Sequence, residues 1–174
     1  MHQAFIALGS NLQNPAAQVE QAFSALARLP KTRLVKKSSL YRTAPVDCPS
    51  EAGSEVPDFI NAVAEVHTEL SAPDLLLALH AIENEAGRER PYVNAPRVLD
   101  CDLLLFDDMV IKSDKLTLPH PRMHTRGFVL LPLFEIAPQL SMPVHGSIAS
   151  LISPELSKDI TKLSITNPGI TNPG

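Results

Sequence analysis

VLDCDLLLF, residues 98–106, is an apolar run interrupted by two aspartates, and its length and composition predict a buried β-strand. Residues two apart lie on the same face of a strand, so Asp100 and Asp102 are expected to point the same way. The opposite face, which is expected to join the core, carries Leu99, Cys101, Leu103 and Leu105. The run therefore predicts a strand that closes a core on one side and presents two carboxylates on the other.

Three further strands are predicted upstream from apolar runs bounded by turn residues, at 3–8, 32–42 and 58–68. Residues 44–57 are rich in Pro, Gly and Ser and predict a loop whose length is often functional in a compact domain. Residues 88–97 form a second irregular stretch, which contains two prolines and three arginines and directly precedes the predicted strand at 98–106. The predicted strands are therefore separated by two long loops.

Two helices are predicted between these strands, each with recognisable ends. The first is expected to begin with Asn14 as its N-cap and Pro15 in the first position, where the missing N–H of proline costs nothing. The second is expected to begin at Ser71, which can cap the helix together with Asp74 three residues later, and to end at Gly87. Both carry apolar residues at helical spacing, so each should bury one face.

The predicted elements end with a short hairpin at 109–118, a loop rich in Pro, His and Arg at 119–126 and an apolar helix at about 127–136. The order strand, helix, strand, strand, helix, strand is the split βαβ pattern, which predicts an antiparallel sheet with helices on one face. The length of 174 residues fits a single domain. We expect its core at about 1–140, followed by a C-terminal extension at 141–174 that ends in ITNPGITNPG and to which we assign no function.

The composition argues against several classes of protein. A formal net charge of -4 and a pI near 5.8 disfavour a general nucleic-acid binder, which usually carries a basic surplus. No window approaches about 18 uninterrupted apolar residues, and the N-terminus lacks the pattern of a signal peptide, so we expect no membrane span and a cytoplasmic protein. Cys48 and Cys101 are too few for a disulfide framework, and Cys101 is expected to be a small core residue.

The aspartate pair is the strongest chemical signal in the sequence. Two carboxylates side by side repel each other unless a cation lies between them, and Mg²⁺ prefers one or two carboxylates together with substrate phosphates. Arg88, Arg90 and Arg97 stand directly upstream and can pair bidentately with phosphate oxygens. These groups together favour phosphoryl transfer, although the same pattern also suits two aspartates that merely face water beside an arginine.

The sequence contains neither GxxxxGK[ST] nor GxGxxG, so a nucleotide site would have to use side chains and metal instead of a glycine-rich loop. Phe59 and Asn61 share a strand face and, with residues 43–46, could grip a flat heterocycle by stacking and hydrogen bonding. Alternatively, Phe59 is a core residue. The loop at 119–126 could contact phosphates or be an ordinary polar surface loop.

Over about residues 4–140 the sequence resembles the 6-hydroxymethyl-7,8-dihydropterin pyrophosphokinase family. The resemblance rests on GSN after the first strand, YRTAP, PDFINA, the run from Gly87 to Phe106, LPHPRM and RGFVLLPLFEIAP. The motif R-x-L-D-x-D, followed by an apolar strand and then P-H-P-R-M, is highly specific. The resemblance implies a ferredoxin-like α+β fold, with an antiparallel sheet, helices packed on it and long mobile catalytic loops.

The resemblance also implies a role for each matching residue. Asp100 and Asp102 would bind two Mg²⁺ ions and take part in catalysis. Arg88 and Arg97 would be catalytic residues that act on the triphosphate. The expected ATP-binding residues are His80, Glu83, Arg90, Leu103, Thr117, His120 and Arg126. The expected pterin-binding residues, which place the ring between two phenylalanines, are Thr43, Ala44, Pro45, Val46, Phe59, Asn61 and Phe128.

The chain departs from the family pattern at a few positions. Members often carry a tryptophan in the arginine loop that closes over the pterin, but this chain has none, so Tyr92 or Asn94, or nothing, would take its place. Phe59 stands where other members have tyrosine, which keeps the stacking surface and loses a hydroxyl. Pro121 also stands where some members have tyrosine, and an insert around 48–56 lengthens the loop on the pterin side.

The expected function is the transfer of pyrophosphate from ATP to the pterin alcohol in folate biosynthesis, giving AMP and the pterin diphosphate. The expected partners are ATP and dihydropterin, with no nucleic acid and no membrane, and the expected state is a monomer. A metal-dependent phosphohydrolase or nuclease could use the same aspartate pair, but it would need a basic groove. A non-catalytic ferredoxin-like binding module would have no reason to keep the aspartates and arginines together.

Overall fold

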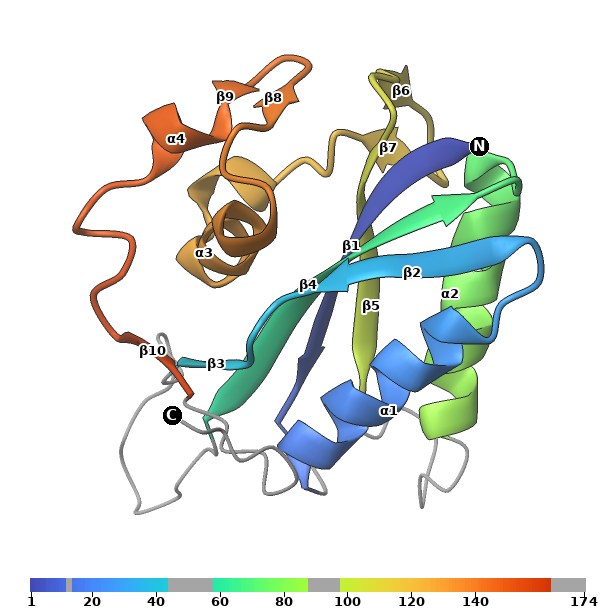
Figure 1. Ribbon diagram of the computed structural model, residues 1–174, viewed down its shortest axis with the longest axis horizontal. Helices are drawn as coiled ribbons and strands as arrows, with labels where there is room; N and C mark the ends of the chain where they lie inside the picture. The colour runs from blue at the N-terminus through green and yellow to red at the C-terminus, as the bar shows by residue number, and fades with distance from the viewer. Residues whose placement is uncertain (12–13, 44–57, 88–97, 164–174) are drawn as a thin grey trace.

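The computed structural model describes residues 1–11, 14–43, 58–87 and 98–163 (Figure 1). The elements up to the strand that carries the two aspartates are β1 (His2–Ser10), α1 (Pro15–Ala27), β2 (Thr32–Lys37), β3 (Tyr41–Thr43), β4 (Phe59–Thr68), α2 (Ala72–Ala86) and β5 (Asp100–Phe106). They are followed by β6 (Ile111–Lys112), β7 (Thr117–Leu118), the 3₁₀ turn η2 (Met123–Thr125), α3 (Gly127–Ile136), β8 (Ser141–Met142), β9 (Gly146–Ser147), α4 (Ile148–Leu151) and β10 (Ile160–Lys162).

The main sheet has the strand order β10-β3-β4-β1-β5, and β2 also pairs with β4. All of its pairings are antiparallel. Because β4 lies between β1 and the β2–β3 segment, and β1 lies between β4 and β5, each βαβ unit is split by a strand of the other. The predicted ferredoxin-like arrangement, an antiparallel sheet with helices packed on it, is confirmed.

Helices cover both faces of the sheet, which differs from the expectation of helices on one face. One core lies between the sheet and α1 with α2, and it includes Val19, Phe23, Leu75 and Leu79. A second core lies on the opposite face and includes Val129, Leu130 and Leu133 of α3. Figure 1 shows α3 on one side of the twisted sheet and α1 with α2 on the other. The chain therefore buries two apolar layers around one sheet.

A register shift in β5 corrects the predicted alternation of that strand. Phe5 of β1 pairs with Leu105, but Ile6 pairs with Leu103, so Leu104 is an extra residue in the ladder. Cys101 and Leu103 join the core beneath α1 and α2, as expected, and Cys101 is buried. Leu105, predicted for the same face, instead belongs with Leu104 to the core beneath α3, because the extra residue reverses the alternation after it.

The predicted helix ends are largely correct. The hydroxyl of Ser71 accepts a hydrogen bond from the Asp74 backbone N–H at 3.2 Å, which is the predicted cap, and α2 ends at Gly87. Asn14 occupies the predicted N-cap position of α1, but its backbone is left-handed (φ 64°) and its side chain makes no capping hydrogen bond. The strand predicted at 32–42 is interrupted between β2 and β3, where Ser38 hydrogen-bonds to the backbone of Val63.

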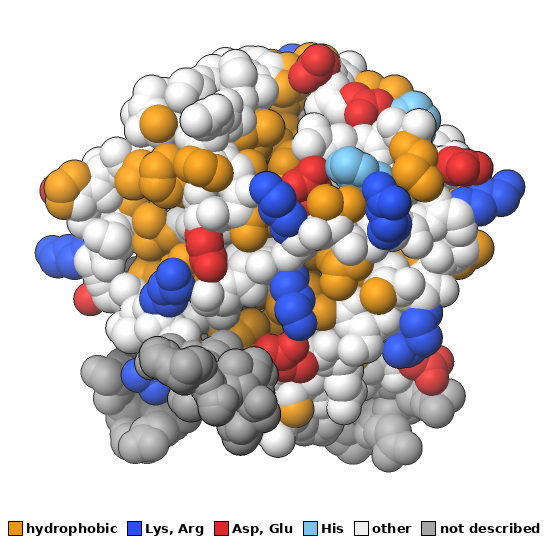
Figure 2. Space-filling model, viewed as in Figure 1, with side chains coloured by type: hydrophobic (Ala, Val, Ile, Leu, Met, Phe, Trp, Pro, Cys, Tyr) orange, Lys and Arg blue, Asp and Glu red, His pale blue; other side chains and the backbone are white. Residues whose placement is uncertain are grey.

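The C-terminal segment continues the fold beyond α3. Met142 and Ile148 are buried in the core beneath α3, and β10 pairs with β3 at the edge of the sheet. Within the described ranges, no helix is long and apolar enough to cross a bilayer. On the face shown in Figure 2, Lys and Arg side chains are scattered among acidic and hydrophobic ones. The predicted loops at 44–57 and 88–97, and the terminal repeat, lie outside the described residues.

Candidate active site

The two aspartates lie on the outer strand of the sheet. Among the described strands β5 pairs with β1 alone, with Asp100 opposite Gly9 and Asp102 opposite Ala7. Asp100 is exposed and Asp102 is partly buried. Ala7 packs against the core beneath α3, so the aspartate pair faces the α3 side of the sheet while Cys101 faces the other side. The predicted shared face of the two carboxylates is therefore confirmed.

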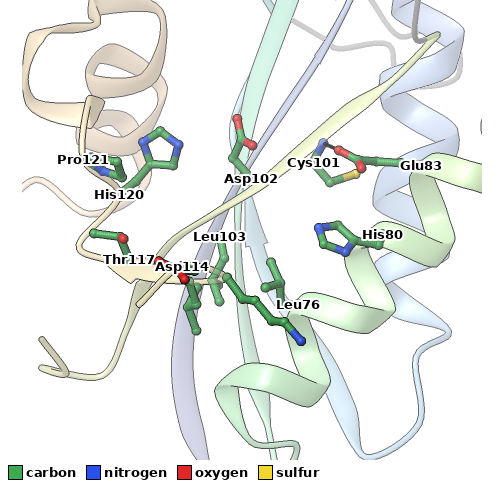
Figure 3. A pocket seen from close by; sticks show the side chains of 12 residues that line it. Leu76, His80, Glu83, Cys101, Asp102, Leu103, Asp114, Thr117, His120 and Pro121 are labelled. Atoms are coloured by element: carbon green, nitrogen blue, oxygen red, sulfur yellow. Dashed lines mark hydrogen bonds between the residues drawn. The ribbon is translucent and has the colours of Figure 1, made fainter. Parts of the chain in front are cut away.

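A cleft of about 270 Å³ opens beside Asp102 (Figure 3). Figure 3 shows His80 and Glu83 of α2 on one side of β5, with Thr117 and His120 on the other. The residues that line the cleft are Leu76, His80, Glu83, Cys101, Asp102, Leu103, Asp114, Lys115, Leu116, Thr117, His120 and Pro121. Five of the seven expected ATP-binding residues therefore lie around one cavity, although they come from three separate parts of the sequence.

Two charged residues of the cleft were missed by sequence analysis. Asp114 and Lys115 belong to the turn between β6 and β7, and both line the cleft. A turn that contains Ser, Asp and Lys carries no signal of its own, because such residues are common in any surface turn. Only the packing of the hairpin against β5 brings Lys115 to the cleft, where an ammonium group can attract an anionic ligand.

Glu83 has a structural contact in addition to its place in the cleft. Its carboxylate accepts a hydrogen bond from the backbone N–H of Cys101 at 2.7 Å. Because β5 is an outer strand, alternate N–H groups of this strand point away from β1 and need another acceptor. Glu83 supplies that acceptor and so fixes α2 against the strand that carries the aspartates.

His120 is held by its backbone and by one ring nitrogen. Its N–H donates to the carbonyl of Leu104 at 2.9 Å, and its Nδ1 accepts from the N–H of Arg122 at 3.2 Å. Burial lowers the pKa of His120; the charge of Asp102 opposes this, while the charges of Arg126 and Arg122 add to it, and the pKa lies below its ordinary value. With Nδ1 as the acceptor, the neutral ring carries its proton on Nε2, which can donate to a ligand.

A second group of predicted residues gathers on β3 and β4. Thr43 lies opposite Phe59, and the side chain of Phe59 is 37% exposed, so the alternative that Phe59 is a core residue is wrong. Asn61 is buried. The hydroxyl oxygen of Thr43 is also buried and has no hydrogen-bond partner among the described residues. An unpaired buried hydroxyl is costly, which makes it a candidate to contact a ligand.

Gly9 connects this group to the aspartates. It lies opposite Asn61 on one side and opposite Asp100 on the other, so the three residues form one row across β4, β1 and β5. A Cβ at Gly9 would lie 2.7 Å from Oδ1 of Asn61, closer than real Cβ atoms approach. The missing side chain therefore leaves room for the Asn61 amide on the path toward Asp100.

Phe128 and Arg126 stand at the start of α3. The guanidinium carbon of Arg126 lies 5.6 Å from the centre of the Phe128 ring, within the range of a cation–π contact. Phe128 is partly buried against the core beneath α3. Arg126 does not line the cleft, but its charge acts on His120. Arg126 is thus close to the Phe128 ring and acts on a residue of the cleft.

The remaining predicted site residues are not placed. Ala44, Pro45 and Val46 of the pterin group lie outside the described residues, as do Arg88, Arg90 and Arg97. Within the part of the chain that the structure describes, no group of three or more His, Cys, Asp or Glu residues could hold a metal ion. A cation at the aspartate pair would therefore need further ligands, such as the phosphates of a substrate.

Comparison with known proteins identifies the family. The family model described as 7,8-dihydro-6-hydroxymethylpterin-pyrophosphokinase (HPPK) matches residues 5–138. A 2-amino-4-hydroxy-6-hydroxymethyldihydropteridine pyrophosphokinase of Haemophilus influenzae is 42% identical over 164 residues, which cover 94% of this chain and 99% of that protein. Its namesake from Pseudomonas aeruginosa is 43% identical over 153 residues, which cover 88% of this chain and 91% of that protein.

The fold is also that of a solved structure. The crystal structure of Plasmodium falciparum HPPK-DHPS wild type with SDX-DHP matches with a TM-score of 0.70 and 15% identity, over 95% of this chain. The chain spans 48% of that longer protein. At this level of identity the likeness concerns the fold alone, whereas the sequence matches above extend over most of the chain. On those matches, the chain belongs to the 7,8-dihydro-6-hydroxymethylpterin-pyrophosphokinase (HPPK) family.

Proposed function

We propose that this protein transfers a pyrophosphoryl group from ATP to 6-hydroxymethyl-7,8-dihydropterin, with AMP and the pterin diphosphate as products, in folate biosynthesis. The observation that carries the proposal is the row formed by Asn61, Gly9 and Asp100. This row places Asn61, which can bind the polar edge of a heterocycle, near Asp100, which can hold a metal ion on phosphates. The residue between them is a glycine, so no side chain separates the two. The names of the relatives supply the identity of the two substrates.

The aspartate pair fits Mg²⁺ by its chemistry. Asp100 and Asp102 offer hard oxygen ligands on one face of β5, and phosphate oxygens of ATP would complete the coordination. Two ions are proposed because a triphosphate and two carboxylates together provide enough oxygens. When bound, magnesium would neutralise the negative charge of the phosphates that are transferred. The two aspartates would act as ligands that hold the ions and orient the phosphates bound to them.

The pterin would lie between Phe128 on α3 and Phe59 on β4. Aromatic side chains on both sides of a flat ring supply stacking surface, and the amide of Asn61 can both donate and accept at its polar edge. The buried hydroxyl of Thr43 would gain the partner that it lacks among the described residues. Residues 44–46 are proposed to continue this edge through their backbone. This arrangement would aim the hydroxymethyl group along the row toward Asp100.

The nucleotide would occupy the cleft beside β5. His80, Glu83, Leu103 and Thr117 line it, and Lys115 adds a positive charge from the hairpin turn. The Nε2–H of His120 can donate to a phosphate oxygen. Arg126 lies near His120 and can pair with the same phosphates. Arg88, Arg90 and Arg97 are proposed to add further guanidinium contacts to the triphosphate.

In the reaction, the hydroxymethyl oxygen of the pterin attacks the β-phosphorus of ATP and AMP leaves. The bond from the β-phosphorus to the α-phosphate bridging oxygen breaks as the new bond to the pterin oxygen forms. The hydroxyl proton of the pterin is released to solvent in the same step. Alignment and charge neutralisation supply most of the acceleration in phosphoryl transfer, so a dedicated general base is not required. The rigid row across three strands is suited to alignment, because its positions are fixed by backbone pairing.

We propose one domain over the whole chain, with a core at about 1–140 and an extension at 141–174, and the family match over residues 5–138 supports this division. A cytoplasmic monomer that binds neither nucleic acid nor membranes is proposed; the acidic composition argues against nucleic acid, and the lack of a long apolar run argues against a membrane span. The phosphohydrolase or nuclease alternative gains no support from the relatives, which are named as pyrophosphokinases.

The test is to incubate the protein with ATP and Mg²⁺, with and without the pterin, and to separate the nucleotides. Pyrophosphoryl transfer predicts that AMP forms only when the pterin is present, in equal amount to the pterin diphosphate. A phosphohydrolase would release nucleotide products without the pterin. A binding module would leave ATP unchanged in both samples. Either of these results would contradict the proposal.

A further inference from the structure

Glu135 lies in the last turn of α3, where the helix dipole disfavours a negative charge. Its carboxylate nevertheless accepts three hydrogen bonds from the junction of β2 and β3, each at 2.9 Å. The donors are the backbone N–H of Ser39, the hydroxyl of Ser39 and the hydroxyl of Tyr41. Lys162 of β10 adds a positive charge 3.8 Å away. We call Glu135, Ser39 and Tyr41 the Glu135 clamp, because they connect α3 to the edge of the sheet.

The clamp pairs an ionised acceptor with neutral donors. Burial, followed by the hydrogen bond to Glu135 and its charge, raises the pKa of Tyr41 above its ordinary value. Burial also acts to raise the pKa of Glu135, but the hydrogen bonds from Ser39 and Tyr41 and the charge of Lys162 outweigh it and hold that pKa below its ordinary value. At neutral pH the Tyr41 hydroxyl therefore donates to a carboxylate, which is a strong, charge-assisted hydrogen bond.

Tyr41 stands beside the polar residue of the candidate pterin site. It lies directly opposite Asn61 on β4, and both residues are buried. Opposite residues of antiparallel strands hold their Cβ atoms about 4.5–5.5 Å apart, so their side chains limit each other. On the other side of Asn61 is Gly9, and Oδ1 of Asn61 lies over it. Asn61 therefore lies between Gly9 and Tyr41 in the row of paired positions, with Tyr41 on the side away from Gly9.

The clamp also links the two walls between which the pterin would lie. α3 carries Phe128 in its first turn and Glu135 in its last turn. β3 carries Tyr41 and, two residues later on the same face, Thr43. Lys36 of β2 also donates a hydrogen bond to the carbonyl of Ile136 at 3.3 Å. The other described contacts between α3 and the sheet are largely apolar, and apolar contacts are non-directional. Hydrogen bonds of defined geometry can set the position of the helix along the sheet more narrowly.

We propose that Glu135 and Tyr41 are positioning residues for the pterin site, which fix the amide of Asn61 and the separation of Phe128 from the sheet. The inference rests on the proposed function, because it takes Asn61 and Phe128 to contact the pterin. Glu135 and Tyr41 act through these two residues and through α3. The cleft beside β5 shares no residue with the clamp. Of the proposed nucleotide contacts Arg126 lies at the start of α3, so ATP binding should depend on the clamp far less than pterin binding does.

The experiment measures both affinities on the full chain by calorimetry. The pterin is titrated in the presence of Mg²⁺ and a non-hydrolysable ATP analogue, and the analogue is titrated separately. Tyr41→Phe keeps the ring and removes the donor, and Glu135→Gln keeps the size and removes the charge. Each variant is expected to raise the Kd for the pterin about tenfold, with a much smaller change in the Kd for the analogue. The Kd of the double variant for the pterin should be no higher than that of the single variant with the higher Kd, because the two residues act as one unit.

A matched control is Glu20→Gln, which removes the exposed ion pair between Glu20 and Lys37 on the α1 side of the sheet. It should change neither Kd. Equal losses for both ligands, or an unchanged Kd for the pterin in folded Tyr41→Phe, would overturn the inference. A wild-type protein that binds the analogue and not the pterin would instead overturn the proposed function, and the inference with it, so the two failures are distinguished by the wild-type titration.

Discussion

Gly9→Ala changes the site by a single methyl group. Gly9 has no positive φ, so alanine suits its backbone. The new Cβ would lie 2.7 Å from Oδ1 of Asn61, whereas ordinary contacts begin at 3.4 Å, so the amide must move by the difference of these values, about 0.7 Å. The methyl group would also stand in the row between Asn61 and Asp100.

The cost to folding and the cost to the site differ in size. Overpacking costs about 1–3 kcal/mol, and the smaller entropy of the unfolded alanine chain offsets about 0.4–1 kcal/mol of that. The protein should therefore stay folded. A misplacement of about 1 Å can cost about a hundredfold in rate, so a shift of about 0.7 Å should lower kcat/KM for the pterin by about ten- to a hundredfold, while ATP binding is unchanged.

The assay is steady-state kinetics with the pterin varied, together with thermal unfolding to confirm folding. Asn61→Ala provides the control, because it removes the atoms that the new methyl group would displace. Gly9→Ala should have little further effect in the Asn61→Ala background, so that the two changes are strongly non-additive. Wild-type kcat/KM for the pterin in Gly9→Ala, or full additivity with Asn61→Ala, would refute the reasoning.

Three further predictions follow from the site and the C-terminal segment. Asp100→Ala and Asp102→Ala should each remove most activity at saturating Mg²⁺ while unfolding curves stay near wild type, because a lost metal ligand costs several kcal/mol of transition-state stabilisation; near-normal turnover by either would contradict the metal assignment. Phe128→Ala should weaken pterin binding far more than ATP binding, by about 0.5–1.5 kcal/mol beyond the lost area, and equal losses in titrations of both ligands would mark Phe128 as a core residue. Burial and the charge of His124 lower the pKa of His145 from 6.5, so the neutral ring stabilises the fold above pH 6.5, and this contribution is lost as the pH falls from there toward the lowered pKa. His145→Phe should therefore flatten the fall of Tm between about pH 7.5 and 5.5, and an unchanged slope would exclude His145 as the cause of that fall.

Local patterns in the sequence were sufficient for most elements. The Ser71 cap, the end of α2 at Gly87 and the bounds of α3 depend on nearby residues, and all three predictions are confirmed. The prediction of helices on one face was wrong for α3, because the split βαβ pattern describes only α1 and α2. The run GFVLLPLFEI is apolar on nearly all sides, and a helix of that kind is expected to be deeply buried. This feature of the sequence could have indicated that α3 has a core of its own.

Long-range register is what local patterns could not supply. The extra residue Leu104 has no mark of its own in a run of three leucines, so the sequence could not show that Leu105 faces α3. The cleft likewise depends on how the hairpin turn with Lys115 packs against β5. The row of Asn61, Gly9 and Asp100 requires the pairing of three strands that are far apart in the chain. Each of these features is set by tertiary packing.

The central claim is that two phosphates of ATP move together to the pterin. The most direct measurement uses ATP labelled at its β-phosphate, incubated with the protein, Mg²⁺ and 6-hydroxymethyl-7,8-dihydropterin, with the label then traced to each product. Attack at the β-phosphorus predicts that the label moves to the pterin and that the AMP is unlabelled. Label retained in ADP, beside a pterin that carries a single unlabelled phosphate, would contradict the account.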